Sequence, residues 1–487
     1  MKQRIYDSQR QELVDLDPRV PGEVGMYVCG PTVQSAPHIG HLRSALAYDL
    51  IRRWLTASGQ RVTLIRNVTD IDDKILDNAR LAQEAGGSEE WWALAYRVER
   101  EFTAAYDAIG VQPPTYEPRA TANIREMIAL IERLIERGHA YPAEDGTASV
   151  YFDTASWPAY GALTRQQRDQ MEDAADGDPS SAAGKRDPRD FALWKAHRDS
   201  EPETAAWPSP WGAGRPGWHI ECSAMATRYL GEEFDIHGGG LDLRFPHHEN
   251  ELAQSTAAGH PFARHWIHNG LVNTGGQKMS KSLGNSLFAA DLLAAARPIV
   301  LRYFLGSAHY RSVLEFSESS LAEAAAAFGR IENLLDRVEE AGLELPPAGA
   351  AGADPRNLPR AFVEAMLDDF AVPQALAVLH GAVRAANTQL DDPTGGDRAE
   401  IRELAQQIAG MLDVLGLNPR DPAWLTSGGS GDEAAAALGE LVEALLEQRA
   451  DARRAKDFAT SDAIRDRLQA VGITIEDSPN GTRWSLA

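Results

Sequence analysis

Hydrophobic residues in the first part of the chain alternate between strand-like runs and helical stripes. Residues 24–29 and 61–68 are short apolar runs, which predict buried strands. Between them, the apolar residues of 39–57 recur every four positions, as on one face of a helix, and residues 72–85 have a similar pattern. A strand, a helix and a strand at this spacing predict a βαβ unit in a parallel sheet.

The pattern changes in the middle of the chain. Residues 124–137 predict an amphipathic helix, and 148–152 predict a strand of a hairpin. Residues 171–190 are acidic and rich in Gly, Ser and Ala, which predicts a solvated surface loop. Three prolines and two glycines in 207–216 mark the predicted return of the chain to the main sheet.

From residue 319 onward the pattern is helical. Two segments rich in Pro, Gly, Ala or Ser, 346–359 and 418–431, predict linkers within this half. Strand patterns around a Ser-Pro-Asn-Gly turn predict a hairpin at the end of the chain. The predicted helices cover 358–370, 373–390 and 397–415, and the hairpin strands cover 473–477 and 482–486.

Composition narrows the class of protein. The 487 residues are 43% hydrophobic and 24% charged, as in ordinary globular proteins, and no apolar run reaches the ~18 residues that span a bilayer. Only Cys29 and Cys222 are cysteines, which excludes a disulfide framework and predicts a cytoplasmic protein. The formal charge of −23 argues against diffuse nucleic-acid binding and confines any RNA contact to local basic segments.

Two motifs have the chemistry of phosphate binding. His38 and His41 flank Gly40 where the first predicted strand gives way to a helix, and helix N-termini bind anions. Lys278 and Lys281, in a glycine-flanked segment, could close over a polyphosphate and neutralise a leaving pyrophosphate. Taken singly, the first motif could equally be two surface histidines, and the second an ordinary basic loop.

A third group of residues could hold a metal ion. His247 and Glu251 share one helix face by their spacing of four, and Cys29 ends the first strand. With Cys222 they make a set of two thiolates, an imidazole and a carboxylate, which suits zinc. From the residues alone, Cys29 and Cys222 could equally be buried free cysteines. His237, His248 and Glu249 could also be ligands. Four protein ligands would ordinarily indicate a structural zinc site.

The two phosphate motifs resemble the HIGH and KMSKS signatures of class I aminoacyl-tRNA synthetases. Four further motifs are similar to those of the cysteinyl-tRNA synthetase family, and the resemblance covers essentially the whole chain. One departure is Gln34-Ser35-Ala36, where many relatives carry an aromatic–acidic pair. The four motifs are Tyr27-Val28-Cys29-Gly30-Pro31-Thr32-Val33, Arg66-Asn67-Val68-Thr69-Asp70-Ile71-Asp72-Asp73-Lys74, Gly217-Trp218-His219-Ile220-Glu221-Cys222-Ser223 and Asp235-Ile236-His237-Gly238-Gly239-Gly240.

The resemblance implies a cysteine–tRNA ligase with one zinc ion per subunit and Mg²⁺ bound with ATP. It implies activation of L-cysteine as the adenylate, transfer to the 3′-terminal adenosine of tRNA(Cys), and selection of cysteine by thiolate coordination to zinc. The implied residues are His38, Gly40, His41, Lys278 and Lys281 for ATP and catalysis, Cys29, Cys222, His247 and Glu251 for zinc, and Trp218, Thr69 and His237 for the amino acid. The alternative for Trp218 is simple packing in the core.

The family's anticodon contacts fall near Arg453, Phe458, Asp462 and Asp477, and Phe458 stands where Trp is frequent. An ordinary charged helix face followed by a packed hairpin is the alternative for this segment. Two rivals to the whole function are a ligase that joins cysteine to an amino sugar, which lacks an anticodon domain, and a non-catalytic zinc- or RNA-binding paralogue. We expect a monomer that does not bind membranes.

We therefore predict an α/β fold, with a Rossmann-like parallel-sheet catalytic domain and an insertion, then an α-helical bundle and a small mixed α/β C-terminal domain. The predicted boundaries are 1–118 for the first half of the catalytic domain, 119–205 for the connective insertion, 206–270 for the second half with the zinc ligands, 271–318 for the KMSKS and stem-contact region, 319–430 for the helical bundle and 431–487 for the anticodon-binding domain.

Overall fold

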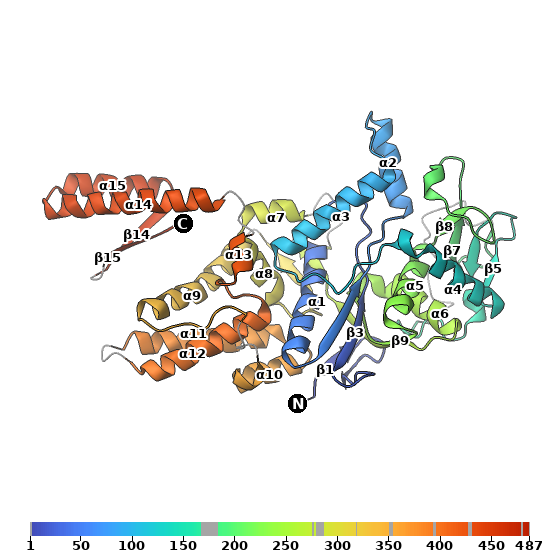
Figure 1. Cartoon of the computed structure of the whole chain (residues 1–487), viewed down its shortest axis with the longest axis horizontal. Helices are drawn as coiled ribbons and strands as arrows, with labels where there is room; N and C mark the ends of the chain where they lie inside the picture. The colour runs from blue at the N-terminus through green and yellow to red at the C-terminus, as the bar shows by residue number, and fades with distance from the viewer. Residues whose placement is uncertain are drawn as a thin grey trace. The chain divides into compact units, whose positions relative to one another are not determined.

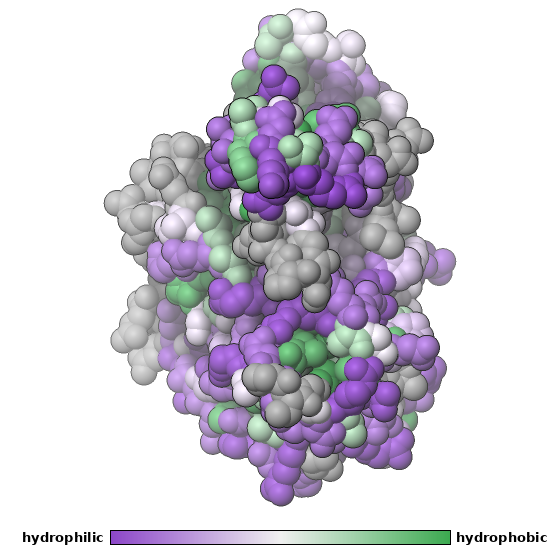
Figure 2. Space-filling view, turned by 90° about the vertical axis from the view of Figure 1, so that its left-hand side faces the viewer, coloured by the Kyte–Doolittle hydropathy of each residue, from purple (hydrophilic) through white to green (hydrophobic). Residues whose placement is uncertain are grey.

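The computed structural model describes two compact units of the chain, Met1–Asp421 and Pro422–Ala487. In the space-filling view of Figure 2, hydrophilic residues cover most of the face shown, and hydrophobic ones form only small separate patches. No helix in the described part of the chain is long and apolar enough to cross a membrane. The described residues are 2–166, 184–274, 277–278, 287–317, 319–349, 354–392, 396–426, 431–478 and 481–486.

A parallel sheet of four strands forms the centre of the first unit (Figure 1). Its strands are β3 (Glu23–Val28), β4 (Arg61–Arg66), β9 (Glu233–Gly240) and β10 (Phe262–Asn269), in the order β10-β9-β3-β4. The chain leaves β3 toward β4 and returns, after an insertion, to β9 on the other side of β3. Ligands of open α/β sheets bind at such a reversal, outside the carboxyl ends of the strands.

Helix α1 (Ile39–Ala57) connects β3 to β4, which confirms the predicted βαβ unit. Leu42, Leu46, Leu50 and Trp54 are buried, as their spacing of four predicts. Each large apolar side chain that leaves water contributes about 1.5–3 kcal/mol to stability. This buried stripe fixes the position of the helix N-terminus, and with it the first phosphate motif.

Two helices follow β4 on the way to the insertion. The predicted helix over 72–85 is α2 (Asp73–Glu84), which the Asp72 side chain caps by accepting from the Lys74 amide. Helix α3 (Trp91–Ala108) was not predicted, although its buried residues recur with helical spacing. Phe102 and Tyr106, on the buried face of α3, extend toward the phosphate motif and the pocket described below.

The insertion has its own antiparallel sheet, in the order β5 (Ala140–Pro142), β6 (Val150–Phe152), β7 (Phe191–Ala196) and β8 (Gly214–Pro216). The predicted helix is α4 (Ile124–Glu136), and the predicted hairpin strand is β6. Of the predicted acidic loop 171–190, residues 171–183 lie outside the described part of the chain.

The prediction that 207–216 returns to the main sheet is wrong. Gly214–Pro216 is the edge strand β8 of the insertion, antiparallel to β7, and a Cβ on Gly214 would lie 2.2 Å from the carbonyl oxygen of Lys195. Proline at the end of an edge strand leaves no ladder bond unmade. The main sheet resumes only at β9, after α5 (Trp218–Leu230).

A helical bundle completes the first unit. It contains α8 (Pro298–Ser307), α9 (Ser320–Glu340), α10 (Arg360–Leu367), α11 (Val372–Leu390) and α12 (Arg398–Leu415), preceded by the short α7 (Ala289–Ala295). Helices α11 and α12 lie side by side in Figure 1 and contact each other. The three helices predicted over 358–415 are thereby confirmed as α10, α11 and α12.

A buried ion pair connects this bundle to α1. The Arg302 guanidinium of α8 lies 2.6 Å from the Asp49 carboxylate of α1, and both side chains are at most 1% exposed. Arg302 also donates to the carbonyl oxygens of Leu415, at the end of α12, and of Ile109 and Gly110, after α3. Removing one partner of such a pair costs about 3–5 kcal/mol, so the bundle and the sheet domain are held as one unit.

The second unit folds around its own small core. Helices α14 (Gly431–Arg454) and α15 (Phe458–Ala470) pack with the hairpin β14 (Ile473–Ser478) and β15 (Gly481–Leu486), which confirms the predicted terminal hairpin. The core consists of Val442, Ile464, Leu468 and Ile473. The predicted linker 418–431 contains a short helix, α13 (Pro422–Thr426), and is therefore not wholly irregular.

Candidate functional site

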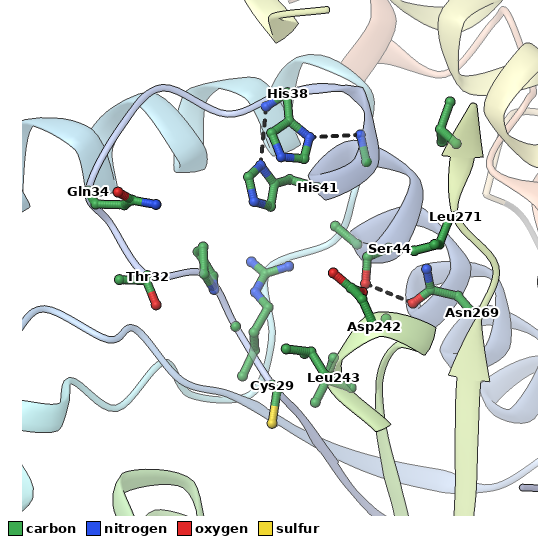
Figure 3. A pocket seen from close by; sticks show the side chains of 18 of the residues that line it. Cys29, Thr32, Gln34, His38, His41, Ser44, Asp242, Leu243, Asn269 and Leu271 are labelled. Carbon is green, nitrogen blue, oxygen red and sulfur yellow. Dashed lines mark hydrogen bonds between the residues drawn. The ribbon is translucent and has the colours of Figure 1, made fainter. Parts of the chain in front are cut away.

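A pocket of about 370 Å³ opens at the carboxyl ends of the parallel strands (Figure 3). It is lined by Cys29 after β3, Arg66 at the end of β4, Gly240 at the end of β9 and Asn269 at the end of β10. This is the edge at which the strand order reverses. The sheet topology therefore explains why residues far apart in sequence share one pocket.

His38 and His41 line the pocket at the start of α1 (Figure 3). The His38 ring accepts at Nδ1 from the Gly40 amide, 3.1 Å away, and His41 Nδ1 accepts from the His38 amide at 3.2 Å. The two rings stack with their centroids 3.7 Å apart. His41 also makes an edge-to-face contact with Phe102, with the ring centroids 4.9 Å apart. The predicted histidine pair thus forms a reciprocal helix cap.

The cap determines which ring nitrogen carries the proton. Because Nδ1 of each neutral imidazole accepts from a backbone amide, the ring proton of both residues is on Nε2. A Cβ on Gly40 would lie 3.0 Å from His38 Cε1, so a side chain there would press on this ring. The helix N-terminus and two Nε2–H donors together suit an anionic ligand.

The second phosphate motif is only partly described. Lys278 belongs to the short strand β12 (Gln277–Lys278), which pairs with β11 (Val272–Thr274), but its side chain lies outside the described residues. Lys281 lies outside them altogether. The backbone of β11 continues from the pocket wall at Leu271 and Val272.

The four residues of the predicted metal set meet at the base of the sheet edge. Cys29 Sγ lies 3.7 Å from Cys222 Sγ and 3.2 Å from Glu251 Oε1, and His247 Nε2 lies 3.1 Å from the same oxygen. All four side chains are buried, and each offers a ligand atom within 4.8 Å of the others. Helix α5 supplies Cys222 and α6 (Glu249–Ala257) supplies Glu251.

These distances fit a tetrahedral ion. Two sulfur ligands at about 2.3 Å from a tetrahedral zinc would be about 3.8 Å apart, close to the separation observed for Cys29 and Cys222. Burial raises the pKa of the Cys29 thiol well above its usual value, and Cys222 and Glu251 add to the rise. A bound cation would stabilise this buried donor set in its deprotonated form, as two thiolates and a carboxylate.

An alternative donor set shares two of these residues. His237 and His248 can be grouped with Cys29 and Glu251, and His237 Nε2 lies 2.8 Å from Glu251 Oε2. This set has only one sulfur, whereas the first has two, the ligand type that favours zinc. Glu249 faces elsewhere, because its carboxylate accepts from the Gly161 and Thr164 amides and from the Thr164 hydroxyl.

Comparison with known proteins decides the family. Residues 15–326 match the model of the class I (C) tRNA synthetase catalytic domain, 361–418 match the DALR domain, and 435–484 match the cysteinyl-tRNA ligase anticodon binding domain. The chain is 65% identical to the cysteine–tRNA ligase of Clavibacter sepedonicus, over 100% of this chain and 99% of that one.

The chain belongs to the cysteine–tRNA ligase family. It is also 61% identical to the family member from Leifsonia xyli and 55% identical to that from Micrococcus luteus, each over the full length of both chains. The predicted family, α/β fold class and enzyme activity are confirmed. The acidic net charge is therefore compatible with a tRNA-binding enzyme.

More distant solved structures share the fold of this cysteine–tRNA ligase family member. Mycobacterium tuberculosis methionyl-tRNA synthetase in complex with methionyl-adenylate superposes with a TM-score of 0.56 at 18% identity, over 81% of this chain and 90% of that one. Agrobacterium radiobacter LeuRS superposes with a TM-score of 0.58 at 12% identity, over 85% and 86%. At these identities the likeness concerns the fold alone.

The three residues predicted for the amino acid lie at different depths. Trp218 lines the pocket and stacks on His247, with ring centroids 4.1 Å apart. His237 is fully buried and bonds to Glu251, and the Thr69 hydroxyl donates to Glu221 at 3.0 Å. Trp218 is thus the member of the three that faces the pocket directly and also supports a predicted metal ligand.

Sequence reasoning assigned no role to several residues that line the pocket. Arg66 stacks on Tyr106, with the guanidinium carbon 4.4 Å from the ring centroid, and pairs with Glu117 at 2.7 Å. Asn269 accepts from the Ser44 hydroxyl at 2.9 Å, as Figure 3 shows. Arg66 and Asn269 both end parallel strands, so their position at the sheet edge was the available signal.

In the C-terminal unit of this chain, the four residues predicted to contact the anticodon are spread over α14, α15 and β14. Phe458 begins α15 and is 64% exposed, and exposed Asp462 lies 3.4 Å from Arg465. Arg453 is in the last turn of α14. Asp477 pairs with Thr482 through the backbone, and its side chain lies outside the described residues.

Proposed function

We propose that the protein activates L-cysteine with Mg·ATP as cysteinyl-adenylate and transfers it to the 3′-terminal adenosine of tRNA(Cys). We further propose that zinc, held by Cys29, Cys222, His247 and Glu251, selects the amino acid. The observation that carries the proposal is the 3.7 Å separation of two sulfurs that are 193 residues apart in sequence. When bound, zinc would supply a soft Lewis acid that prefers the cysteine thiolate to the hydroxyl of serine.

The two phosphate motifs of this chain would have different roles in the reaction. His38 and His41 would donate from Nε2 to phosphate oxygens of ATP, and the α1 N-terminus adds its positive end. Lys278 and Lys281 would stabilise the charge that develops as pyrophosphate leaves. The reaction requires orientation and charge stabilisation, and we assign no protein nucleophile.

Trp218, Thr69 and His237 would enclose the amino acid near the metal ligands. Trp218 is placed to close one side of the site, because it both lines the pocket and stacks on His247. Thr69 and His237 are held by Glu221 and Glu251, so their role would be to shape the site rather than to move in it. Recognition through a soft metal–thiolate contact removes the need for an editing domain.

The C-terminal unit favours tRNA over an amino sugar as the acceptor. The match of 435–484 to an anticodon binding domain supports this assignment. We propose that Arg453, Phe458, Asp462 and Asp477 contact anticodon bases, since single-stranded RNA loops are read by stacking and by hydrogen bonds to base edges. The monomeric state, the cytoplasmic location, the Mg²⁺ and the six-part division of the chain stay predictions.

Transfer of radiolabelled cysteine tests the acceptor. We expect labelling of tRNA(Cys), and no labelling of a glucosaminyl-inositol acceptor, by the wild-type protein. Labelling only of the amino sugar would overturn the proposal, and absence of cysteine-dependent ATP–pyrophosphate exchange would favour a non-catalytic paralogue. In the same experiment, Cys222→Ser should lose both zinc and exchange activity, while a fully active zinc-free protein would contradict the metal's role.

A further inference from the structure

A turn between α8 and β13 (Leu314–Phe316) is anchored to the start of α1. Arg43, two residues after His41, is 2% exposed and donates to the carbonyl oxygens of Leu305, Ala308 and His309. Carbonyls at a helix C-terminus lack intrahelical partners, so the guanidinium satisfies groups that would otherwise be unpaired. The turn is therefore held at a fixed distance from the histidine motif.

The same turn supports one wall of the pocket. The Tyr310 carbonyl accepts from the Gly270 amide at 2.7 Å, and the Leu314 amide donates to the Leu271 carbonyl at 2.9 Å. Gly270 and Leu271 line the pocket. A Cβ on Gly270 would lie 2.2 Å from the carbonyl oxygen of Ser312, so this close approach requires glycine.

From this wall the backbone leads to the lysine signature. Strand β13 pairs in parallel with β11, and β11 pairs with β12, which contains Lys278. The three-stranded sheet has the order β12-β11-β13. Any displacement of the 308–312 turn would therefore shift both the pocket wall and the strand from which the signature segment begins.

Asp369 holds the far side of the turn. One carboxylate oxygen accepts from the Tyr310 hydroxyl at 2.7 Å and from the Tyr6 amide at 2.8 Å, and the other lies 2.6 Å from Arg311 Nε. His309 Nε2 is 3.6 Å from the second oxygen. Asp369 is 3% exposed, so these contacts are not shared with bulk water.

The backbone at this position is strained. Asp369 has φ of 59° and the next residue, Phe370, has φ of 53°, the left-handed region that few residues other than glycine adopt. Phe370 is 1% exposed and packs against Tyr310, with ring centroids 6.3 Å apart. Two adjacent strained residues persist only where the surroundings fix them, and such strain is concentrated at functional sites.

We propose that Asp369 is a positioning residue for the activation of the amino acid by ATP. Its carboxylate accepts from Tyr310 and Arg311, the Tyr310 carbonyl accepts from the Gly270 amide, and β13 and β11 connect this wall to Lys278 in β12. The inference rests on the proposed role of Lys278 and Lys281. It assigns a function in the catalytic pocket to a residue of the helical bundle, between α10 and α11.

The test is Asp369→Asn in the full-length protein. Asparagine tolerates the left-handed conformation and keeps one acceptor oxygen, but it removes the charge that holds Arg311. Asp368→Asn is the matched control, since the neighbouring carboxylate is 60% exposed and pairs with Arg4 at the surface. We would measure kcat and KM for ATP and for cysteine in ATP–pyrophosphate exchange, together with zinc content and thermal stability.

We expect Asp369→Asn to lower kcat/KM for ATP at least ten-fold, with KM for cysteine and zinc content unchanged, and Asp368→Asn to match the wild type. Wild-type kinetics in Asp369→Asn would overturn the proposal. So would a fall in kcat that tracks the loss of folded protein while KM for ATP stays constant, since that is the signature of domain packing alone.

A double-mutant cycle separates this inference from the proposed lysine role. If Asp369 acts through the signature segment, its substitution should cost much less in a Lys281→Ala background than in the wild type. Additive effects would overturn the inference and leave the lysine role intact. A fully active Lys281→Ala protein would instead refute the lysine role itself.

Discussion

His219 and His247 face each other through their Nδ1 atoms, 3.0 Å apart in the buried interior. Because His247 Nε2 points to Glu251 and the metal set, a ligand His247 must carry its proton on Nδ1 and donate it to His219. His219 therefore accepts at Nδ1 and is neutral, in agreement with burial lowering its pKa to about 3.

This relationship predicts that His219 supports metal affinity without binding the metal. His219→Leu should weaken zinc binding about 10–100-fold, the usual cost of removing a partner of a ligand histidine. Zinc affinity is measured by competition with a chelator. His219→Asn, which keeps an acceptor oxygen, is the control and should recover most of the affinity. Equal losses in the two variants would show that the hydrogen bond is not what matters.

Two glutamates in α6 should separate metal binding from loop anchoring. Glu251→Gln should abolish stoichiometric zinc, because a neutral amide is a poor ligand. Glu249→Gln should keep zinc but lower the free energy of unfolding by about 1–3 kcal/mol, because its carboxylate accepts three hydrogen bonds from Gly161 and Thr164. Metal analysis and urea unfolding check the pair, and zinc loss in Glu249→Gln would contradict the ligand assignment.

The cap geometry predicts that the two roles of His38 can be divided. Asparagine can accept from the Gly40 amide as His38 does, but it lacks the Nε2–H donor. His38→Asn should therefore unfold at the wild-type urea concentration while ATP–pyrophosphate exchange falls about 100-fold. His38→Ala, which loses the cap as well, should also be destabilised by about 1 kcal/mol. Retained exchange in His38→Asn would remove the phosphate role.

Acid should weaken the contact between α2 and the insertion. Burial alone would raise the pKa of Asp73, but the nearby charges of Lys195 and Arg215 outweigh it and lower the pKa to about 2. A carboxylate with a depressed native pKa stabilises the fold above its unfolded pKa, 3.8, and loses that contribution as pH falls toward 2.

The stability difference between the wild type and Asp73→Asn should accordingly depend on pH. We expect about 2 kcal/mol at pH 7 and roughly half of that at pH 3, from ~1.4 kcal/mol per pKa unit. Urea unfolding at both pH values measures it. A difference that is the same at pH 7 and pH 3 would mean that the carboxylate's charge does not stabilise this contact.

In the C-terminal unit, exposed Phe458 should contribute to tRNA recognition alone. Phe458→Ala should lower kcat/KM for tRNA(Cys) about ten-fold, the loss of one stacked base, and leave ATP–pyrophosphate exchange unchanged. Phe458→Trp should charge tRNA at least as well as the wild type. Val471→Ala, at a 69% exposed position of the same unit, is the control, and an equal loss there would show a general effect of the unit's surface.

Local patterns were sufficient for several of the helices and strands and for much of the site. The spacing of four along 39–57 predicted α1, and the motif around Gly40 placed two histidines at its start. The resemblance supplied the metal set, which the structure brings together.

Contacts that depend on tertiary packing could not be read from the sequence. Gly214–Pro216 has the composition of a connecting loop, yet it pairs as an edge strand because β7 is available beside it. The role of His219 depends on its contact with His247, 28 residues away, and the role of Asp369 depends on its contact with a turn near residue 310. Helix α3 was not predicted, although its buried residues recur with regular helical spacing and the local sequence contains that signal.

The distance along the chain between Cys29 and Cys222 has a consequence for metal binding. Closing a loop of 193 residues costs about 5 kcal/mol in chain entropy. This cost lowers the affinity of an ion that would bind both sulfurs in the unfolded chain. In the folded protein the parallel sheet and α5 hold the two sulfurs 3.7 Å apart, so this entropy has already been lost when the ion binds. We therefore expect the proposed zinc ion to bind the folded protein, in which the two sulfurs already lie close together, more tightly than the unfolded chain.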